Sequence, residues 1–333
     1  MGKLMSKKVI LICGATGFVG RNMLEYFGKN SHYKIRAVYN TRKPYDTSHL
    51  LSEIEWINAD LRDPNQVKQA VTGVDYIIQA AATTSGAKDI VTKPYIHVTD
   101  NAVMNSLLLR FAYHANIKHF IFFSCTVMYQ SSDEALTEKD WDETSPLHPR
   151  YFGVGYTKIY IEKMLEFFSN ISEMKTTAIR HSNIYGPYDK YDFDRSHVFG
   201  ATISKVLLAD KEVNVWGTGE EERDLLHVDD LCSFVEKALE NQKKDYALYN
   251  CGLGDKISIR KLVELIINKS GKNLTIKHDL SQPTIKTSLF LDNSLAEKEL
   301  DWSPTIDLDQ GVENTINWWR QNIDKKSLKV KKV

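Results

Sequence analysis

The sequence has neither an apolar run long enough to cross a membrane nor an excess of charge of one sign. Its 43 basic side chains are matched by 43 acidic ones, so bulk electrostatics gives no reason to expect nucleic acid or an anionic surface as a partner. Its longest apolar runs, such as "VILIC" at 9–13 and "FIFF" at 120–123, are far shorter than the roughly 20 residues of a transmembrane helix. We therefore expect no nucleic-acid partner and no membrane partner.

Cysteine is also scarce. Cys13, Cys125, Cys232 and Cys251 are widely separated, without a C-x-x-C pair or a Cys/His pair at metal-ligand spacing, so the sequence predicts neither a disulfide scaffold nor a metal site. The N-terminal lysines are not followed by the long apolar segment of a signal peptide. Reduced thiols in a cytoplasmic protein are the expectation.

What the first half does contain is a regular alternation of apolar runs and helical patterns. We expect strands at 7–13, 34–40, 54–61, 74–82 and 118–125, a sixth strand running into a loop over 175–187, and helices at 17–30, 63–73, 99–116 and 155–170. Strands that alternate with helices imply parallel β-α-β crossovers. The sequence therefore predicts an α/β fold with a Rossmann-type doubly wound parallel sheet.

After Pro187 the alternation loosens. Helices are expected at 199–211, at 258–271 and from about Gly311. We expect a dinucleotide-binding domain over 6–185, to which 206–240 returns, a smaller C-terminal α/β substrate-binding lobe over 186–325, and a basic disordered tail over 326–333. A ligand cleft is expected between the two lobes.

The string "CGATGFVG" places Gly14, Gly17 and Gly20 between the first strand and the first helix. Such a turn needs a residue that is free at positive φ, a backbone that approaches a pyrophosphate closely, and tight packing of helix on sheet. The helix N-terminus then offers unpaired N–H groups to an anion. The turn predicts dinucleotide binding.

The second strand ends without the acidic residue that accepts from an unphosphorylated ribose. Tyr39 and Asn40 stand there, and Arg42 and Lys43 follow. A guanidinium at this place can hold a 2′-phosphate bidentately, which favours NADP(H) over NAD(H); a solvated basic loop is the alternative. Asp60, at the end of the third strand, is placed to accept from the adenine amino group.

Together these residues resemble a known family. The glycine turn, "NADLRD", "IIQAAA", Asn101, Lys158 with Glu162, "RHSNIYGP" and "RDLLHVDDL" resemble the extended short-chain dehydrogenases/reductases, the NAD-dependent epimerase/dehydratase family, and most of all its GDP-L-fucose synthase-like members. The likeness covers about 8–320. It implies a bilobal enzyme with a bound nicotinamide cofactor, a nucleotide-sugar substrate, GDP-linked, and a homodimer built on the helices around 101–116 and 157–170.

The resemblance also implies roles for single residues. Lys158 matches the lysine that holds the nicotinamide ribose, His197 an acid in sugar epimerisation, Arg223 an arginine on the substrate diphosphate, and Trp216 the base end of that ligand. Asn183 matches the loop that flanks the nicotinamide. The expected cofactor residues are Gly14, Thr16, Gly17, Phe18, Val19, Arg42, Asp60, Leu61, Ala80, Ala81, Lys158, His181 and Asn183.

Three positions depart from the family's pattern. The acid/base tyrosine falls on Val154, the serine or threonine on Cys125 beside Thr126, and the cysteine base on Val127. Tyr156 points about 200° away from Lys158 on an ideal helix. If "YFGVG" is not helical, its glycines let a loop bring Tyr151 to the site, which makes Tyr151 the first candidate for the missing acid.

Other assignments stay open. Cys125 is a small buried thiol or an acid/base beside Lys158, His181 is a core histidine or a substitute acid, and the tyrosines are packing aromatics or catalytic groups.

The sequence predicts a nucleotide-sugar oxidoreductase/epimerase that acts at C4 or a neighbouring carbon of a GDP-hexose or GDP-heptose. The alternatives are a 4,6-dehydratase or epimerase working through a transient 4-keto sugar and, from another class, a non-catalytic nucleotide-sugar or NADP(H) sensor.

Overall fold

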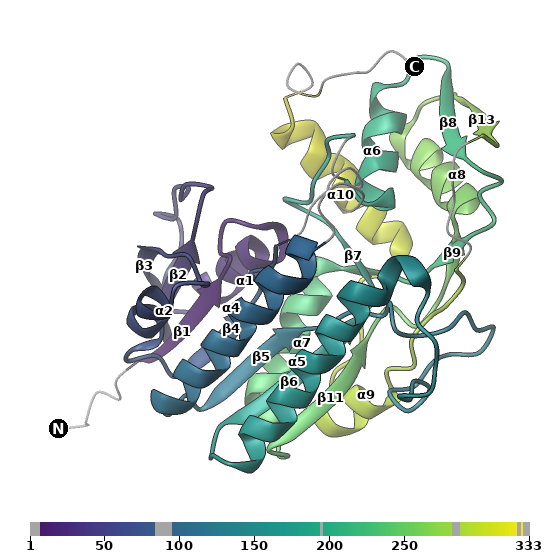
Figure 1. Cartoon of the computed structure of the whole chain (residues 1–333). Coiled ribbons are helices and arrows are strands. Elements are labelled where there is room, and N and C mark those ends of the chain that lie inside the picture. The colour runs from purple at the N-terminus through teal and green to yellow at the C-terminus, as the bar shows by residue number, and fades with distance from the viewer. Residues whose placement is uncertain (1–6, 84–94, 194–195, 282–286, 325–327, 329–333) are drawn as a thin grey trace.

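The computed structural model describes residues 7–83, 95–193, 196–281, 287–324 and 328, and it has a large α/β lobe with a smaller lobe above it in Figure 1. The large lobe is built on a seven-stranded sheet of parallel neighbours in the order β11-β6-β5-β4-β1-β2-β3. Its strands are β1 (Lys8–Cys13), β2 (Tyr33–Tyr39), β3 (Glu53–Asn58), β4 (Tyr76–Gln79), β5 (His119–Phe123), β6 (Lys175–His181) and β11 (Tyr246–Cys251). The predicted doubly wound sheet is confirmed, since the chain winds outward from β1 in both directions.

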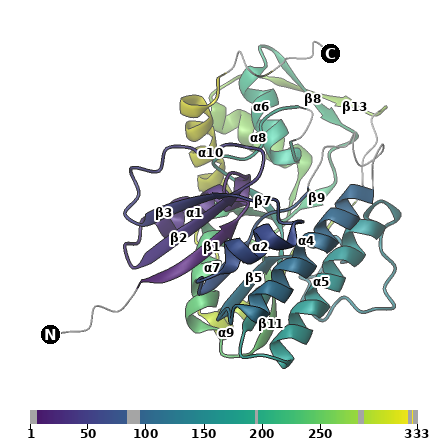
Figure 2. The ribbon, with the colours of Figure 1, turned by 60° about the vertical axis from the view of Figure 1, so that its left-hand side comes forward.

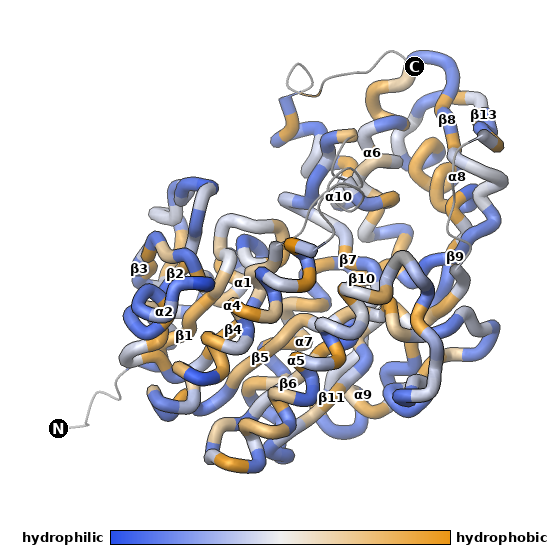
Figure 3. The backbone as a smooth tube through the Cα atoms, in the orientation of Figure 1, coloured by the Kyte–Doolittle hydropathy of each residue, from blue (hydrophilic) through white to orange (hydrophobic). Residues whose placement is uncertain are grey.

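Helices cover both faces of this sheet, and Figures 1 and 2 show them as two layers. One layer consists of α2 (Pro64–Val71), α4 (Tyr95–His114) and α5 (Phe152–Asn170), the other of α1 (Phe18–Gly28), α7 (Val228–Asn241) and α9 (Ser294–Leu300). Because apolar side chains are needed on both faces, β5 is buried at every position and the tube is largely orange along β1 and β5 in Figure 3.

The smaller lobe packs three helices around its own core. These are α6 (Val198–Leu208), α8 (Ile259–Ser270) and α10 (Leu308–Asn322), next to the parallel pair β8 (Glu212–Trp216) and β13 (Thr275–Asp279). Two short pairs lie where the lobes join: β7 (Asn183–Tyr185) with β10 (Leu225–His227), and β9 (Glu222–Arg223) with β12 (Ile257–Ser258). The domain boundaries given from the sequence stay a prediction, and the expected tail, apart from Leu328, lies outside the described residues.

The condition under which the glycines of "YFGVG" would let a loop bring Tyr151 to the site is not met. The helix α5 begins at Phe152, after a short 3-10 turn (η1, Pro149–Tyr151), so Gly153 and Gly155 are both helical. A Cβ on Gly153 would lie 2.8 Å from Val98 Cγ2, and one on Gly155 would lie 2.7 Å from Leu147 Cδ1. The glycines therefore serve close packing of the helix start, not flexibility.

Two further observations concern the described ranges alone. None of their helices combines the length and the apolarity that crossing a membrane requires. Nor do three His, Cys, Asp or Glu side chains gather there in a way that would hold a metal ion.

Candidate active site

The end of β1 leads into a glycine turn that lies against the end of β4. Gly14 has a φ of +70°, and a Cβ on it would lie 2.8 Å from Ala81 Cα. A Cβ on Gly20 would lie 2.2 Å from the Gly14 carbonyl oxygen, so a side chain there would push α1 off the turn. No side chain caps α1 at Gly17, which leaves its first N–H groups for an anion.

Most of the expected cofactor residues lie on this edge of the sheet. Thr16, Phe18 and Val19 belong to the turn and to the start of α1, Ala80 and Ala81 directly follow β4, and Asp60 and Leu61 come shortly after β3. Ligands of doubly wound sheets bind at the carboxyl ends of the strands. The topology therefore brings these residues together at the place where such a cofactor binds.

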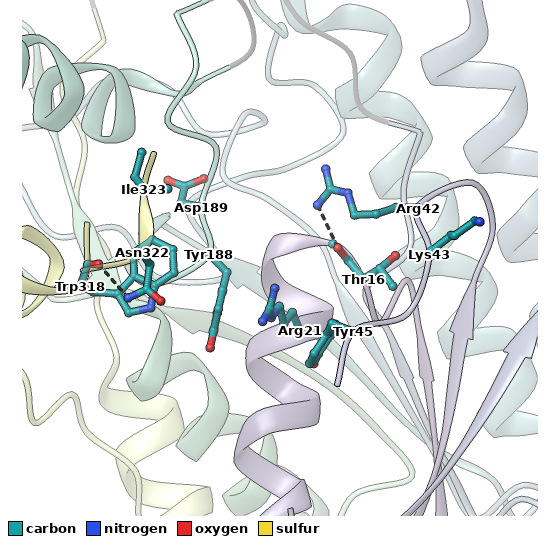
Figure 4. A pocket seen from close by; sticks show the side chains of 11 residues that line it. Thr16, Arg21, Arg42, Lys43, Tyr45, Tyr188, Asp189, Trp318, Asn322 and Ile323 are labelled. Carbon is teal, nitrogen blue, oxygen red and sulfur yellow. Dashed lines mark hydrogen bonds between the residues drawn. The ribbon is translucent and has the colours of Figure 1, made fainter. Parts of the chain in front are cut away.

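Arg42 lies beside the glycine turn. Its Nη1 donates a hydrogen bond to the Thr16 carbonyl oxygen at 2.9 Å. Arg42 and Lys43 line one side of a cavity of about 440 Å³, and the other side is formed by the second lobe at Tyr188 and Trp318, as Figure 4 shows. Basic side chains at this cavity suit an anion.

The Asp60 carboxylate is ionised and held by a neighbour. Arg62 Nη2 lies 2.7 Å from Asp60 Oδ2, and Arg62 Nη1 lies 2.8 Å from Asp100 Oδ2. The hydrogen bond from Arg62 lowers the pKa of Asp60. Each carboxylate oxygen can accept a further bond, so the expected contact with an adenine amino group stays available.

Lys158 points from α5 toward the end of β5. Its Nζ donates to the Phe123 carbonyl oxygen at 2.6 Å and lies 4.5 Å from the centroid of the Phe122 ring. Burial lowers the pKa of Lys158, and the nearby Cys125 and Glu162 oppose that shift. The ammonium is thus fixed at the carboxyl edge of the sheet, as the sequence predicts.

A buried ion pair between α5 and β6 lies next to this part of the site. Arg180 Nη2 lies 2.8 Å from Glu162 Oε2, and both side chains are almost fully buried. Ser124 Oγ donates to Glu162 Oε1 at 2.5 Å, and Arg180 Nη1 donates to the Tyr129 hydroxyl at 3.2 Å. Because a buried charge without its partner is costly, this network fixes the segment that carries Cys125.

Of the three positions expected to depart from the family's pattern, Val154 lies at the start of α5, whereas Cys125 and Val127 follow β5. Val154 is in the helix one turn before Lys158 and therefore on the same face. A Cβ on Gly155 would lie 3.6 Å from Val127 Cγ2, so Val127 packs near the first turns of α5. The thiol of Cys125 has a raised pKa because it is desolvated, while Lys158 lowers it in part, so it is a neutral thiol and a poor base at neutral pH.

The two tyrosines near Val154 face different surroundings. Tyr156 is 40% exposed and packs edge-on against Phe152, with centroids 4.9 Å apart, on the outer side of α5. Tyr151 ends the 3-10 turn and is half-buried. The pKa of Arg223 is lowered mainly by burial and raised by Tyr151, so Tyr151 lies near the arginine expected on the substrate diphosphate.

Two histidines, His181 of the large lobe and His197 of the smaller lobe, are candidate site residues. His181 ends β6, its Nδ1 lies 2.7 Å from the Ser182 carbonyl oxygen, and burial lowers its pKa to about 4, with contributions from Lys158 and His197. His197 is the exposed N-cap of α6. The two rings and Lys158 thus share one electrostatic neighbourhood, and His181 is a neutral ring at neutral pH.

The remaining predicted residues come from both lobes. Asn183 is exposed, and its Nδ2 donates to the Asp224 carbonyl oxygen at 3.2 Å. Trp216 ends β8 with 53% of its surface exposed, and Lys205 Nζ lies 5.4 Å from the centroid of its ring. Thr126 follows Cys125, and its carbonyl oxygen accepts from Tyr129 N at 3.1 Å.

Sequence reasoning missed one feature of this region. The guanidinium of Arg21, in α1, lies between the rings of Tyr45 and Tyr188, 3.8 Å from each centroid. The two tyrosines are 143 residues apart along the chain (188 − 45), so no local pattern could indicate the contact.

Comparison with known proteins agrees with this geometry. The model of a family described as "NAD dependent epimerase/dehydratase family" matches residues 10–252. The chain is 28% identical over 316 residues to GDP-L-colitose synthase of Yersinia pseudotuberculosis, covering 93% of this chain and 97% of that one. It is 24% identical over 318 residues to GDP-L-fucose synthase of Azorhizobium caulinodans, covering 94% and 96%.

Among solved structures, UDP-glucose 4-epimerase of Thermotoga maritima superposes with a TM-score of 0.79 at 23% identity, covering 95% of this chain and all of that one. At that identity the match shows a shared fold. Together with the family match and the named relatives, it confirms the resemblance that the motifs indicate.

Proposed function

The chain belongs to the NAD dependent epimerase/dehydratase family, and we propose that it is a nucleotide-sugar oxidoreductase/epimerase acting at C4 or a neighbouring carbon of a GDP-linked hexose or heptose. One observation carries the proposal: the glycine turn, Arg42 and Lys158 lie on one edge of the sheet. Hydrogen bonds to backbone carbonyl oxygens hold the side chains of Arg42 and Lys158 there. Relatives named for GDP-sugars along nearly the whole chain support the GDP link.

The residues on this edge fit a nicotinamide dinucleotide. The glycine turn and the uncapped start of α1 suit its pyrophosphate, and Lys158 suits the ribose next to the nicotinamide. When bound, such a cofactor supplies or accepts the hydride. Because Arg42 and Lys43 line the cavity beside the turn, we propose NADP(H) rather than NAD(H).

Proton transfer is the task of the chain's own residues. A carbonyl that gains a hydride needs a proton on its oxygen, and a positioned acid contributes about 10²–10⁴-fold to such a step. We propose Tyr151 as this acid, because Val154 has no proton to give, Tyr156 faces away from Lys158, and Tyr151 precedes α5 and is not bound to the helix face of Tyr156. Tyr151 also lies near Arg223, the arginine expected on the substrate diphosphate.

A cytoplasmic location stays part of the proposal. All four cysteines are unpaired, which fits a reducing compartment.

The test is turnover of GDP-, dTDP- and UDP-linked sugars and their 4-keto forms, followed by nicotinamide absorbance and by mass spectrometry of the sugar, with NADPH and NADH compared. We expect turnover with a GDP-linked substrate and tighter binding of NADPH than of NADH, and Arg42→Ser should remove that preference. If the protein binds both cofactor and GDP-sugars but changes none of them, the non-catalytic sensor replaces the enzyme.

A further inference from the structure

The side chain of Arg21 contacts both lobes, because its guanidinium lies between the rings of Tyr45 and Tyr188. We call this arrangement the sandwich of Arg21. Tyr45, on one side of the guanidinium, belongs to the loop after β2 that also carries Arg42. Tyr188, on the other side, belongs to the loop that runs from β7 toward His197. Arg21 therefore contacts both the loop expected at the cofactor and the loop expected at the sugar.

The loop of Tyr188 depends on these contacts for its shape. Tyr188 has a φ of +65°, a left-handed conformation that is unfavourable for a residue with a side chain. Its ring packs edge-on against Trp318 of α10, with centroids 5.0 Å apart, and Asn22 Nδ2 of α1 donates to the Pro187 carbonyl oxygen at 2.9 Å. Contacts with α1 and α10 therefore offset the cost of this conformation.

The same side chains line the cavity beside the glycine turn, as Figure 4 shows. Three buried polar atoms of residues that line this cavity, Arg21 Nε, the Tyr45 hydroxyl oxygen and Asp189 Oδ2, have no hydrogen-bond partner among the described residues. An unpaired buried donor or acceptor is destabilising. An anion can accept from the two donors, Arg21 Nε and the Tyr45 hydroxyl, so the cavity has the features of a binding site that involves both lobes.

We propose that Arg21 is a positioning residue that couples the cofactor site to the sugar site by holding the Tyr188 loop when an anionic group of the cofactor lies in the cavity beside Arg42. This inference rests on the proposed function, since it needs both ligands. Stacking between two rings fixes the plane of the guanidinium and leaves its N–H edge free to donate.

Coupling of this kind acts in both directions. An anion that pairs with the edge of Arg21 restrains the guanidinium and, through it, Tyr188. A sugar nucleotide that contacts the residues directly after β7 restrains Tyr188 and so prepares Arg21 for the anion. Because both effects come from the same coupling free energy, each ligand tightens the binding of the other by the same factor.

Calorimetric titrations measure that factor without turnover. The dissociation constant of GDP is determined with and without saturating NADPH, and that of NADPH with and without GDP. We expect each ligand to tighten the other by about fivefold or more, and Arg21→Met to bring both factors close to one. Tyr188→Leu should do the same, whereas Tyr188→Phe, which keeps the ring, should retain the coupling.

Tryptophan fluorescence gives a second readout, because Tyr188 packs on Trp318. Trp318 contributes one component of the emission, which the Trp318→Phe variant lacks. NADPH alone should change this component in the parent but not in Arg21→Met. The inference is wrong if the parent binds both ligands independently, if Arg21→Met couples them as the parent does, or if Tyr188→Phe behaves like Tyr188→Leu. A parent that binds neither NADPH nor GDP contradicts the proposed function itself, so the two failures are distinct.

Discussion

Tyr151 and Tyr156 are chemically identical and only five positions apart, yet their surroundings assign them different roles. Tyr151 lies at the helix start near Arg223, whereas Tyr156 packs on Phe152 at the outer surface of α5. A proton can be transferred only by a group that reaches the reacting oxygen. The proposal of Tyr151 as the acid therefore rests on its position and not on its residue type.

The matched pair of variants tests this choice. Tyr151→Phe removes only the hydroxyl and should lower kcat by about 10²-fold or more, because it removes the acid, with little change in the dissociation constant of NADPH. Tyr156→Phe should keep kcat within about twofold of the parent, since it loses no group near Lys158. Equal activity of the two variants would exclude Tyr151 as the acid.

Asp189 should make stability depend on pH. Burial raises the pKa of Asp189 to about 7; its Oδ1 accepts from Lys190 N at 2.7 Å, and its Oδ2 has no partner among the described residues. The folded protein therefore holds a proton that the unfolded chain releases, so this stabilisation is lost as the pH rises from about 4 to about 7. The shift corresponds to roughly 4 kcal/mol.

Asp189→Asn is the variant that isolates this effect. The free energy of unfolding is measured with denaturant from about pH 4 to pH 8. That of the parent should fall relative to that of the variant up to about pH 7, and above pH 7 the difference between the two proteins should stay constant. A difference between the two proteins that is constant over the whole range would mean that Asp189 titrates normally.

At the scale of elements, α1 and α5 show what a sequence can and cannot predict. The spacing of Gly14, Gly17 and Gly20 predicts the turn and the helix because each glycine meets a local steric need. The start of α5 was predicted wrongly, because Gly153 and Gly155 have the same local signature in a loop as in a closely packed helix. What makes them helical is contact with Val98 and Leu147, which no local pattern reveals.

The helical start of α5 leads to a rescue experiment. Because Val154 lies one turn before Lys158 on the same face, a tyrosine there has the spacing that the family's pattern uses. We expect Tyr151→Phe/Val154→Tyr to regain at least about tenfold in kcat over Tyr151→Phe. Val154→Phe in the same background is the control, since it adds the ring without the hydroxyl. Equal activity of the two double variants would mean that position 154 does not reach the reacting oxygen.

At the scale of the whole molecule, α4 and α5 lie side by side in Figures 1 and 2, and several of their apolar side chains are exposed to solvent. Tyr95 (61% exposed), Phe152 (61%), Tyr160 (53%) and Phe167 (57%) are among them. Exposed apolar patches mark interaction surfaces. The homodimer expected from the sequence stays a prediction, and this face is where we place it.

Light scattering after size exclusion tests the dimer. The parent should have twice the mass of one chain, and Tyr160→Glu/Phe167→Glu should have the mass of one chain, because charges buried at an apolar interface are costly. Leu51→Glu, at a residue that is 69% exposed outside these helices, should stay dimeric. A parent with the mass of one chain would remove this face as a dimer interface.

The contacts between the two lobes are the part of the fold that the sequence predicts least well. The strand order follows from the alternation of strands and helices, but the sandwich of Arg21 joins residues from three distant segments. Its parts resemble ordinary surface residues in the sequence, because a cation between two rings is defined only by tertiary packing.

The account's central claim is that a working nicotinamide site performs redox chemistry on a nucleotide sugar although position 154 is a valine. Transfer of deuterium from nicotinamide-labelled NADPH to a GDP-4-keto sugar, detected by mass spectrometry, tests it most directly. The account predicts one deuterium at C4 of the product with the parent and strongly reduced incorporation with Lys158→Met. Absence of deuterium from every GDP-, dTDP- and UDP-linked 4-keto sugar, with NADPH shown to be bound, would contradict it.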